Sequence, residues 1–325
     1  MSLASTHSRP EIDRSLSATV VICTHDAERW PALCRAVGSV RAQLRPAHQI
    51  VVVVDHADEL AARARDAFSD ALVVTNVHGR GLAGARNSAL AHSVGDIVVF
   101  LDDDASAEPT WLDQLLAVYE DPRVIGAGGA VVPVWPAGRP RWFPTEFDWV
   151  VGCSWVGLPD RVAPVRNPIG ASMSFRRGAF ACAGLFTDGI GRGRRDAMGC
   201  EETEFTIRLR HARPESLVVY VPAAEVHHHL DRRRTSWTYF ATRCHAEGRS
   251  KALVAGAVGT RDALASERQY SRKVLPAAVV QGLRDARHGD PSGVLRAATI
   301  VAGLGITAAG YAEGRVSARV RQLRG

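Results

Sequence analysis

Short apolar runs alternate with amphipathic segments over the first third of the chain. Three runs have the continuous hydrophobicity of strands that are covered on both faces: Ala18 to Cys23, Ile50 to Val54 and Ile97 to Leu101. Apolar residues at spacings of three and four from Trp30 to Leu44 indicate an amphipathic helix between the first two. This alternation predicts an α/β fold, with a mostly parallel central sheet and helices on both of its faces.

The pattern changes twice further along the chain. Residues 133–168 are rich in Pro and Trp and have few periodic segments, which predicts a long loop region whose aromatic side chains fill a core or stack on an acceptor. From residue 235 onward the pattern is helical. We therefore expect a disordered tail over residues 1–16, an α/β domain over residues 17–234 and a helical region over residues 235–325.

Acidic and glycine-rich segments stand at the carboxyl ends of the predicted strands. Asp55 ends the second strand, a glycine-rich turn at residues 78–87 follows the third, and Asp102, Asp103 and Asp104 follow the apolar run of the fourth. Because ligands of such sheets bind at the carboxyl ends of strands, we expect these segments to face one crevice. Clustered carboxylates favour Mg²⁺ or Mn²⁺, which bind diphosphate oxygens; alone, the aspartates also fit an acidic turn.

A second acidic group begins a predicted helix. Glu202, with Glu201 as the second choice, is a candidate general base, although acidic residues in a first turn also simply favour the helix dipole. Arg194 and its neighbours form a basic, glycine-flanked loop just before it, which either closes over a substrate or is a solvated surface.

Three consecutive histidines, residues 227–229, first suggest a zinc site. Adjacent residues of an extended segment point in alternate directions, so at most the first and third share a face. The run by itself therefore does not predict a three-histidine zinc site, and it leaves open which histidine has a role in a site.

Composition narrows the function classes only slightly. The 325 residues carry a formal net charge of +6, which fits nucleic acid, an acidic membrane surface or an anionic substrate. No nucleic-acid-binding module is recognisable, so nucleic acid is not an expected partner. The six cysteines lack Cys-x-x-Cys spacing and residues 1–15 lack an apolar core, so we expect a cytoplasmic protein.

The last predicted helix leaves two interpretations open. The uncharged run Ala297 to Ala312 is too short and too rich in Gly and Ala to predict a membrane span. With the arginines that begin at Arg315, it predicts either peripheral contact with the inner face of the cell membrane, or packing on the α/β domain or on a second subunit of a homodimer.

Together these segments resemble the family 2 glycosyltransferases, inverting enzymes with the GT-A fold, over roughly residues 17–232. The turn at residues 81–87 is similar to the family's Gly-x-x-x-Ala-Arg-Asn, the aspartates to its Asp-x-Asp metal motif, and residues 201–204 to its Glu-Asp-x-Glu segment. Residues 23–26 are similar to its Pro-Thr-Tyr-Asn, with Cys, His and Asp as departures. Residues 243–251 resemble a bacterial subset with a C-terminal helical extension.

The resemblance implies roles for individual residues. The residues that it implies for donor binding are Thr24, Asp26, Asp55, Gly81, Arg86, Asp102, Asp103 and Arg194. The metal ligands are Asp104, Asp102 and His227. The catalytic base is Glu202 or Glu201, with Glu202 standing where the family has Asp.

The implied activity is metal-dependent, inverting transfer of a sugar from a nucleotide-diphosphate donor to a hydroxyl acceptor. The resemblance implies UDP as the nucleotide of the donor. That acceptor is a cell-envelope glycan, a lipid-linked sugar or a small molecule. A nucleotidyltransferase is the first alternative, but it requires a glycine-rich signature directly after the first strand, and residues 23–30 contain no glycine. A non-enzymatic nucleotide-sugar-binding protein is the second, and the intact carboxylates count against it.

Overall fold

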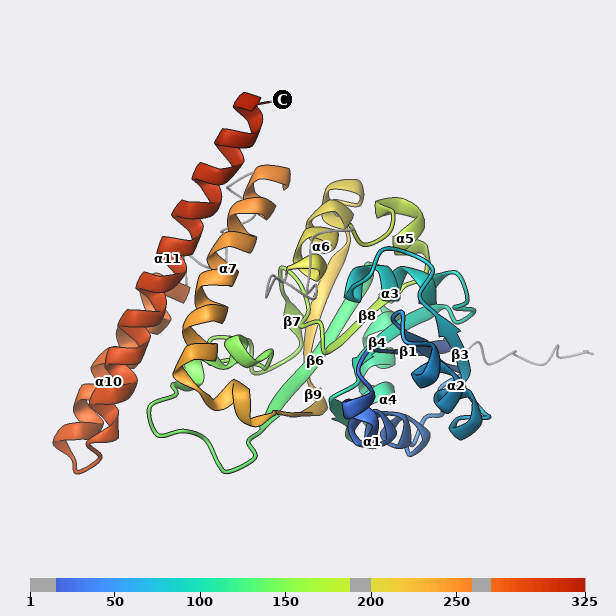
Figure 1. Ribbon diagram of the computed structural model, residues 1–325, viewed down its shortest axis with the longest axis horizontal. Helices are drawn as coiled ribbons and strands as arrows, with labels where there is room; N and C mark the ends of the chain where they lie inside the picture. Colours follow the sequence, from blue (N-terminus) through green and yellow to red (C-terminus); the bar gives the residue numbers. More distant parts are fainter. Residues whose placement is uncertain (1–15, 188–199, 259–269, 325) are drawn as a thin grey trace, which may run out of the picture.

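A mixed sheet of nine strands lies at the centre of the protein, in a computed structural model that describes residues 16–187, 200–258 and 270–324. The predicted disordered tail lies, except for residue 16, outside the described residues. Helices cover the sheet on both faces, and a group of long helices stands along one flank (Figure 1). This arrangement confirms the predicted fold class of an α/β sheet with a C-terminal helical region.

The first half of the sheet is parallel, as predicted, and runs in the order β3-β2-β1-β4. Its strands are β1 (Ala18–Thr24), β2 (Gln49–Val54), β3 (Leu72–Thr75) and β4 (Ile97–Asp102). The connecting helices are α1 (Trp30–Arg41), which follows the short helix η1 (Ala27–Arg29), α2 (Asp58–Ala67) and α3 (Leu82–Leu90). Valine-rich strands buried between helices explain the uniform apolar runs of the sequence.

The second half of the sheet is mixed rather than mostly parallel. Its strands are β5 (Ala105–Ala107), β6 (Val124–Val134), β7 (Ala163–Pro164), β8 (Ser172–Arg176) and β9 (Leu217–His229). Strand β8 lies between β4 and β6 and is antiparallel to both, whereas β6 and β9 are parallel. The chain reverses direction in the long segment between β6 and β8. The sequence did not predict this reversal, because an apolar run has the same pattern in a parallel and in an antiparallel strand.

The helices of this half position the site. They are α4 (Trp111–Ala117) with η2 (Val118–Glu120), α5 (Gly178–Ala183) and α6 (Glu201–Ala212). The Trp-rich loop contains the helix η3 (Thr145–Val151), and its Phe143 and Phe147 are buried against Phe240 of the C-terminal region. These two aromatic side chains therefore belong to the core.

The C-terminal region follows η4 (Arg232–Thr235). It consists of α7 (Trp237–Val258), the π-helix η5 (Tyr270–Val274), α10 (Leu275–Arg287) and α11 (Ser292–Arg324). The predicted domain boundary after residue 234 falls within η4 and stays a prediction. By length and composition, residues 292–317 of α11 reach the range of a membrane-spanning helix, with a mean hydropathy of 1.5 and a third of the window buried.

Helices α7 and α11 pack side by side (Figure 1). Glycines make the close approach possible: a Cβ atom on Gly248 would lie 2.1 Å from the Thr307 carbonyl oxygen, and one on Gly310 would lie 2.1 Å from that of His245. A larger side chain at either position would therefore force the two helices apart.

Candidate active site

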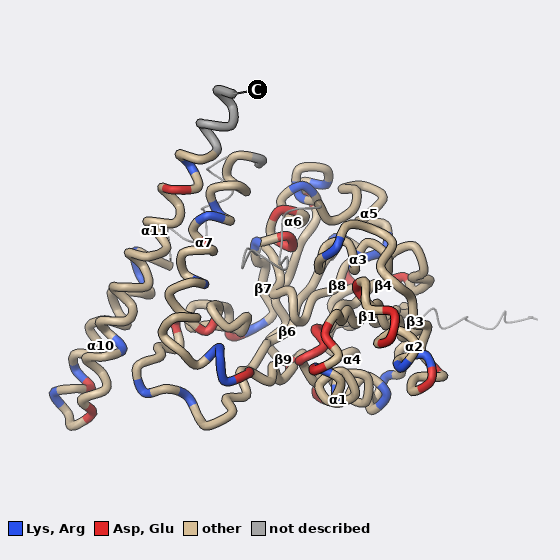
Figure 2. Tube along the Cα trace, in the orientation of Figure 1, with Lys and Arg blue, Asp and Glu red and all other residues tan. Residues whose placement is uncertain are grey.

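Acidic residues gather where β1, β2 and β4 end (Figure 2). At the end of β2, the Asp55 carboxylate accepts hydrogen bonds from the backbone N–H of Gly81 (2.9 Å) and from Asn76 Nδ2 (2.6 Å). Gly81 precedes α3 with a φ of 129°, a conformation open essentially to glycine. Asp55 and Gly81, both predicted to bind the donor, thus fasten the glycine-rich turn to the sheet.

Asp103 points into the protein. Its carboxylate accepts hydrogen bonds from Thr24 Oγ1 (2.8 Å) and Arg29 Nη1 (2.7 Å), which ties β1, η1 and β4 together. Burial raises the pKa of Asp103, although the Arg29 charge opposes that shift. Thr24 and Asp103, two predicted donor contacts, bond to each other, and Asp26 caps η1 by accepting from the Glu28 N–H.

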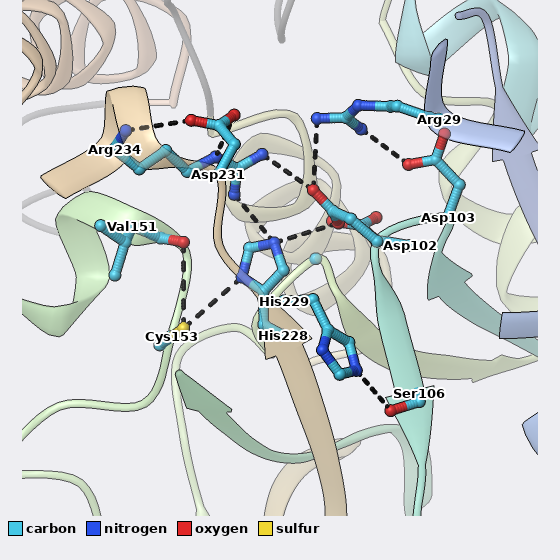
Figure 3. Close-up of polar contacts among 12 residues, drawn as sticks. Arg29, Asp102, Asp103, Ser106, Val151, Cys153, His228, His229, Asp231 and Arg234 are labelled. Atoms are coloured by element: carbon cyan, nitrogen blue, oxygen red, sulfur yellow. Dashed lines mark hydrogen bonds and ion pairs between the residues drawn. The ribbon is translucent and has the colours of Figure 1, made fainter. Parts of the chain in front are cut away.

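Asp102, Asp104 and His228 form a compact cluster, with one ligand atom of each within 4.8 Å of the others. The His228 Nε2 atom lies 3.0 Å from Asp104 Oδ1, and Arg234 Nη2 donates to Asp104 Oδ2 at 2.9 Å. Figure 3 shows the guanidinium of Arg234 beside the His228 ring. Arg29 adds a second ion pair to Asp104 at 3.2 Å. Sequence reasoning missed Arg234, because it is one of three consecutive arginines and no local signal separates it from a surface residue.

The structure places His228, rather than the predicted His227, beside the aspartates. Side chains alternate along β9, so His228 faces Asp104 whereas His227 and His229 face the other way. The His227 Nε2 atom bonds to Glu108 Oε1 at 2.6 Å, and His229 Nε2 bonds to Ser106 Oγ at 2.9 Å. The alternation was expected, but which member of the run faces the aspartates depends on the register of β9, which pairs Ala105 with His228.

His228 stands between several polar groups. Its Nε2 atom lies 2.8 Å from Arg234 Nη1 and 3.0 Å from Asp104 Oδ1. Its other ring nitrogen, Nδ1, lies 3.5 Å from the Cys153 sulfur. Two carboxylates and one imidazole nitrogen are a donor set that a divalent cation fits.

Arg86 connects this cluster to the start of α6. Its guanidinium is buried, donates from Nη1 to Glu201 Oε1 (2.9 Å) and from Nη2 to the Gly170 carbonyl oxygen (3.1 Å), and lies 3.6 Å from Asp102 Oδ1. The other carboxylate oxygen of Glu201 is buried and has no hydrogen-bond partner among the described residues.

Glu202, the predicted base, lies beside that pair. Burial and the neighbouring Glu201 charge raise the pKa of Glu202 to about 7, the range in which a carboxylate removes a proton at neutral pH. The preceding residue of the helix start, Cys200, adopts a φ of 77°, which is uncommon for a residue other than glycine. Glu204 instead pairs with Arg208 at 2.5 Å, and Arg194 lies outside the described residues.

Asp102, Arg86, Glu201 and Glu202 line one cavity of about 490 Å³ between the sheet and the C-terminal helices. The model of the family "Glycosyl transferase family 2" matches residues 19–184 of the chain. The chain belongs to this family. Its enzymes are glycosyltransferases, and the chain is accordingly a glycosyltransferase of the hexosyl-transferring type.

Curated family 2 relatives match most of the chain. The glucosyl-dolichyl phosphate glucuronosyltransferase of Haloferax volcanii is 34% identical over 243 residues, which are 74% of this chain and 77% of that protein. The succinoglycan biosynthesis protein ExoM of Rhizobium meliloti is 28% identical over 263 residues, 77% of this chain and 80% of the relative.

Solved structures show the GT-A fold. The mannosyltransferase PcManGT of Pyrobaculum calidifontis, in complex with GDP-Man and Mn²⁺, has a TM-score of 0.55 at 17% identity, covering 90% of this chain and 86% of that one. GalNAc-T7 with UDP, GalNAc and Mn²⁺ has a TM-score of 0.53 at 18% identity, covering 72% of this chain and 48% of that one.

Proposed function

We propose that this family 2 glycosyltransferase is metal-dependent and inverting, and that it transfers a sugar from a nucleotide diphosphate to an acceptor hydroxyl. The observation that carries the proposal is the position of Arg86. It joins Asp102 of the acidic cluster to Glu201, next to Glu202, so a cation-binding group and a base with a pKa of about 7 adjoin one cavity.

The metal-binding group of the proposal is Asp102, Asp104 and His228. Carboxylates suit Mg²⁺ or Mn²⁺, and the softer imidazole favours Mn²⁺ of the two. When bound, such a cation supplies a Lewis acid for the leaving diphosphate. Arg234 stays beside it, orienting His228 and sharing the negative charge of Asp104. The presence of Mn²⁺ in PcManGT and in GalNAc-T7 supports this choice of ion.

Donor recognition is assigned to the strand-end residues. The predicted set remains our proposal for contacts with the donor: Thr24, Asp26, Asp55, Gly81, Arg86, Asp102, Asp103 and Arg194. Because Asp55, Thr24 and Asp103 already hold the turn, η1 and the strands in place, their contribution includes keeping that surface rigid before the donor arrives. A UDP-sugar is the expected donor.

Glu202 acts on the acceptor. An acceptor oxygen attacks the anomeric carbon from the side opposite the diphosphate, forming the new C–O bond while the old C–O bond breaks and its electron pair leaves with the diphosphate. The hydroxyl proton goes to the Glu202 carboxylate. Burial and the charge of Glu201, which Arg86 holds in place, keep the Glu202 pKa high enough to accept that proton.

The acceptor belongs to cell-envelope glycan synthesis in this proposal, and the enzyme works at the inner face of the membrane. Two large apolar side chains of α11, Leu295 and Val301, are more than half exposed, and no Lys, Arg, Asp or Glu interrupts Ala297 to Ala312. An exposed apolar face next to arginines favours peripheral membrane contact. The alternative predicted from sequence, a homodimer through the same helix, is an outcome that light scattering distinguishes.

Donor hydrolysis tests the proposal. We expect release of UDP from one of a panel of UDP-sugars in the presence of Mn²⁺, loss of release with EDTA, and recovery on adding Mn²⁺. Release that EDTA leaves unchanged would contradict the metal. Binding of the donor without either hydrolysis or transfer would instead identify the non-enzymatic alternative.

A further inference from the structure

The cavity beside Glu202 has two chemically different ends. At one end lie Asp102, Arg86, Glu201 and Glu202, the groups of the proposed reaction. The rest of its wall combines apolar and aromatic side chains from η3 and the loop after it, η5, α10 and α11 with polar side chains, among them Arg243, Glu247 and Lys251 of α7. These wall residues include Phe147, Trp149, Trp155, Tyr270, Leu275, Leu304, Ala308 and Tyr311.

Binding a sugar and transferring it to a hydroxyl group does not require an apolar wall of this extent. A sugar presents hydroxyl groups, which need hydrogen-bonding partners when they are buried. Polar side chains that can supply them line the cavity near Glu202 and along α7, where Lys251 pairs with Glu247 at 3.0 Å. The hydrocarbon side chains of Leu275, Leu304 and Ala308 suit an apolar part of a ligand, and the hydroxyl of the neighbouring Thr307 already donates to the Gly303 carbonyl oxygen at 2.8 Å.

This apolar side continues to the outer surface of the protein along α11. Leu304 lines the cavity and is also 42% exposed, so it lies where the cavity meets the surface. One turn away Val301 is 61% exposed, and it lines a shallow apolar groove with Val294 and with Leu283 of α10. A hydrocarbon chain that leaves the cavity at Leu304 therefore meets a further apolar surface.

We propose that the acceptor is a lipid-linked sugar, and that the first part of its hydrocarbon chain lies in this cavity against η5 and α11 while its sugar hydroxyl reaches Glu202. The inference rests on the proposed function. A cavity of about 490 Å³ is in the range of small-molecule sites, roughly 300–1,000 Å³, so it holds a head group and only the beginning of a long chain. The remainder follows α11 toward the membrane.

The occupant is chosen by its chemistry. A soluble glycan would leave the apolar wall unused, and a free lipid would bring no sugar hydroxyl to Glu202. A sugar joined through phosphate to a hydrocarbon chain satisfies both ends. The Haloferax volcanii relative is named for a substrate of this composition, a glucosyl-dolichyl phosphate.

A series of acceptors with one head group tests the inference. Glucosyl phosphate is esterified to a ten-carbon isoprenoid alcohol, to decanol or to methanol, and transfer is measured with the donor selected by hydrolysis. We expect kcat/KM to be at least about tenfold higher for the chain-bearing esters than for the methyl ester, because burying two methylene groups accounts for roughly that factor. Equal use of both chains identifies general hydrocarbon binding, and preference for the isoprenoid identifies a polyprenyl carrier.

Two exposed positions of α11 provide matched variants. Leu304→Glu places a charge at the cavity mouth, and Val316→Glu places one on the same helix at a residue that is 62% exposed and does not line the cavity. We expect Leu304→Glu to bring the chain-to-methyl ratio close to one and Val316→Glu to leave it unchanged. Equal ratios in all three proteins, or equal use of the methyl ester by the wild type, would overturn the inference.

Calorimetry without donor separates this inference from the proposed function. If the wild type hydrolyses the donor but uses the methyl ester as well as the esters with a hydrocarbon chain, only the acceptor inference is wrong. If the wild type neither hydrolyses nor transfers, the proposed function is wrong. Binding of the isoprenoid ester that is weakened in Leu304→Glu but not in Val316→Glu would still support the cavity, and absence of binding by the wild type would refute it.

Discussion

The strand-end side of the site, from β1 to β4, and the cavity wall built by η3, η5 and α11 are constructed in different ways. On the strand-end side, the aspartates stand at or just after the ends of buried strands. Arg29, Arg86 and Arg234 connect Asp102, Asp103 and Asp104 through ion pairs and hydrogen bonds. The cavity wall is apolar, and its residues come together only because distant helices pack on the sheet.

This difference determines how strongly a substitution on each side affects the enzyme. Charged groups in a buried network depend on one another, so losing one leaves its partner unpaired and the effect is large. Apolar wall residues act mainly through area, so a single change alters affinity gradually. Substitutions on the two sides should therefore have unequal effects.

The largest effect is expected at the proposed base. Glu202→Gln removes the proton acceptor but keeps the shape of the side chain, so kcat for transfer should fall by about 10²–10⁴-fold while donor affinity, measured by calorimetry, stays the same. Glu215→Gln, on an exposed turn after α6, is the matched control and should retain full activity. Normal transfer by Glu202→Gln would show that another group takes the proton.

The two neighbouring histidines should differ in their response to metal. His228→Asn should lower the apparent affinity for Mn²⁺ by more than the roughly 10–100-fold loss that follows removal of an outer-shell partner. His227→Asn, which interrupts only the contacts with Glu108 and Glu225, should leave the Mn²⁺ titration unchanged. The reverse ranking would restore His227 as the metal contact and would mean that the observed register of β9 is not the functional one.

Membrane contact should depend on α11 and not on the α/β domain. Leu295→Glu combined with Val301→Glu should reduce flotation with anionic vesicles about tenfold, since two exposed apolar side chains are replaced by charges. Leu44→Glu combined with Val94→Glu, exposed residues near the sheet, is the control and should float like the wild type. Equal flotation of both double variants would refute docking through α11.

The smallest effect concerns pH. A base must be deprotonated, so kcat/KM should rise with pH through a midpoint of about 7, set by burial and by the Glu201 charge. Glu201→Gln removes that like charge and should move the midpoint to lower pH. Because the folded-state pKa of Glu202 is raised, its contribution to stability is present at low pH and is lost as pH rises through about 7. An unchanged midpoint in Glu201→Gln would remove Glu201 from the tuning of the base.

Much of the strand-end side was predictable because the information is local. Each carboxylate was found by its place after an apolar run, and parallel strands bring their carboxyl ends to one edge of a sheet. The roles of Asp103 and His228 were not predictable in this way. Asp103 is directed inward by Thr24 and Arg29, and His228 is selected by a register that pairs residues more than 100 positions apart.

The amino-acid sequence by itself determined the family, the parallel half of the sheet and the acidic groups at its edge, because strand patterns and short motifs are properties of neighbouring residues. Only the tertiary structure decided that the sheet is mixed, that Arg86 links Asp102 to Glu201, and that Phe147, Tyr270 and Leu304 enclose one cavity beside Glu202. These features depend on contacts between segments far apart in the chain. An apolar side chain has the same pattern in a sequence whether it fills a core or lines a binding site.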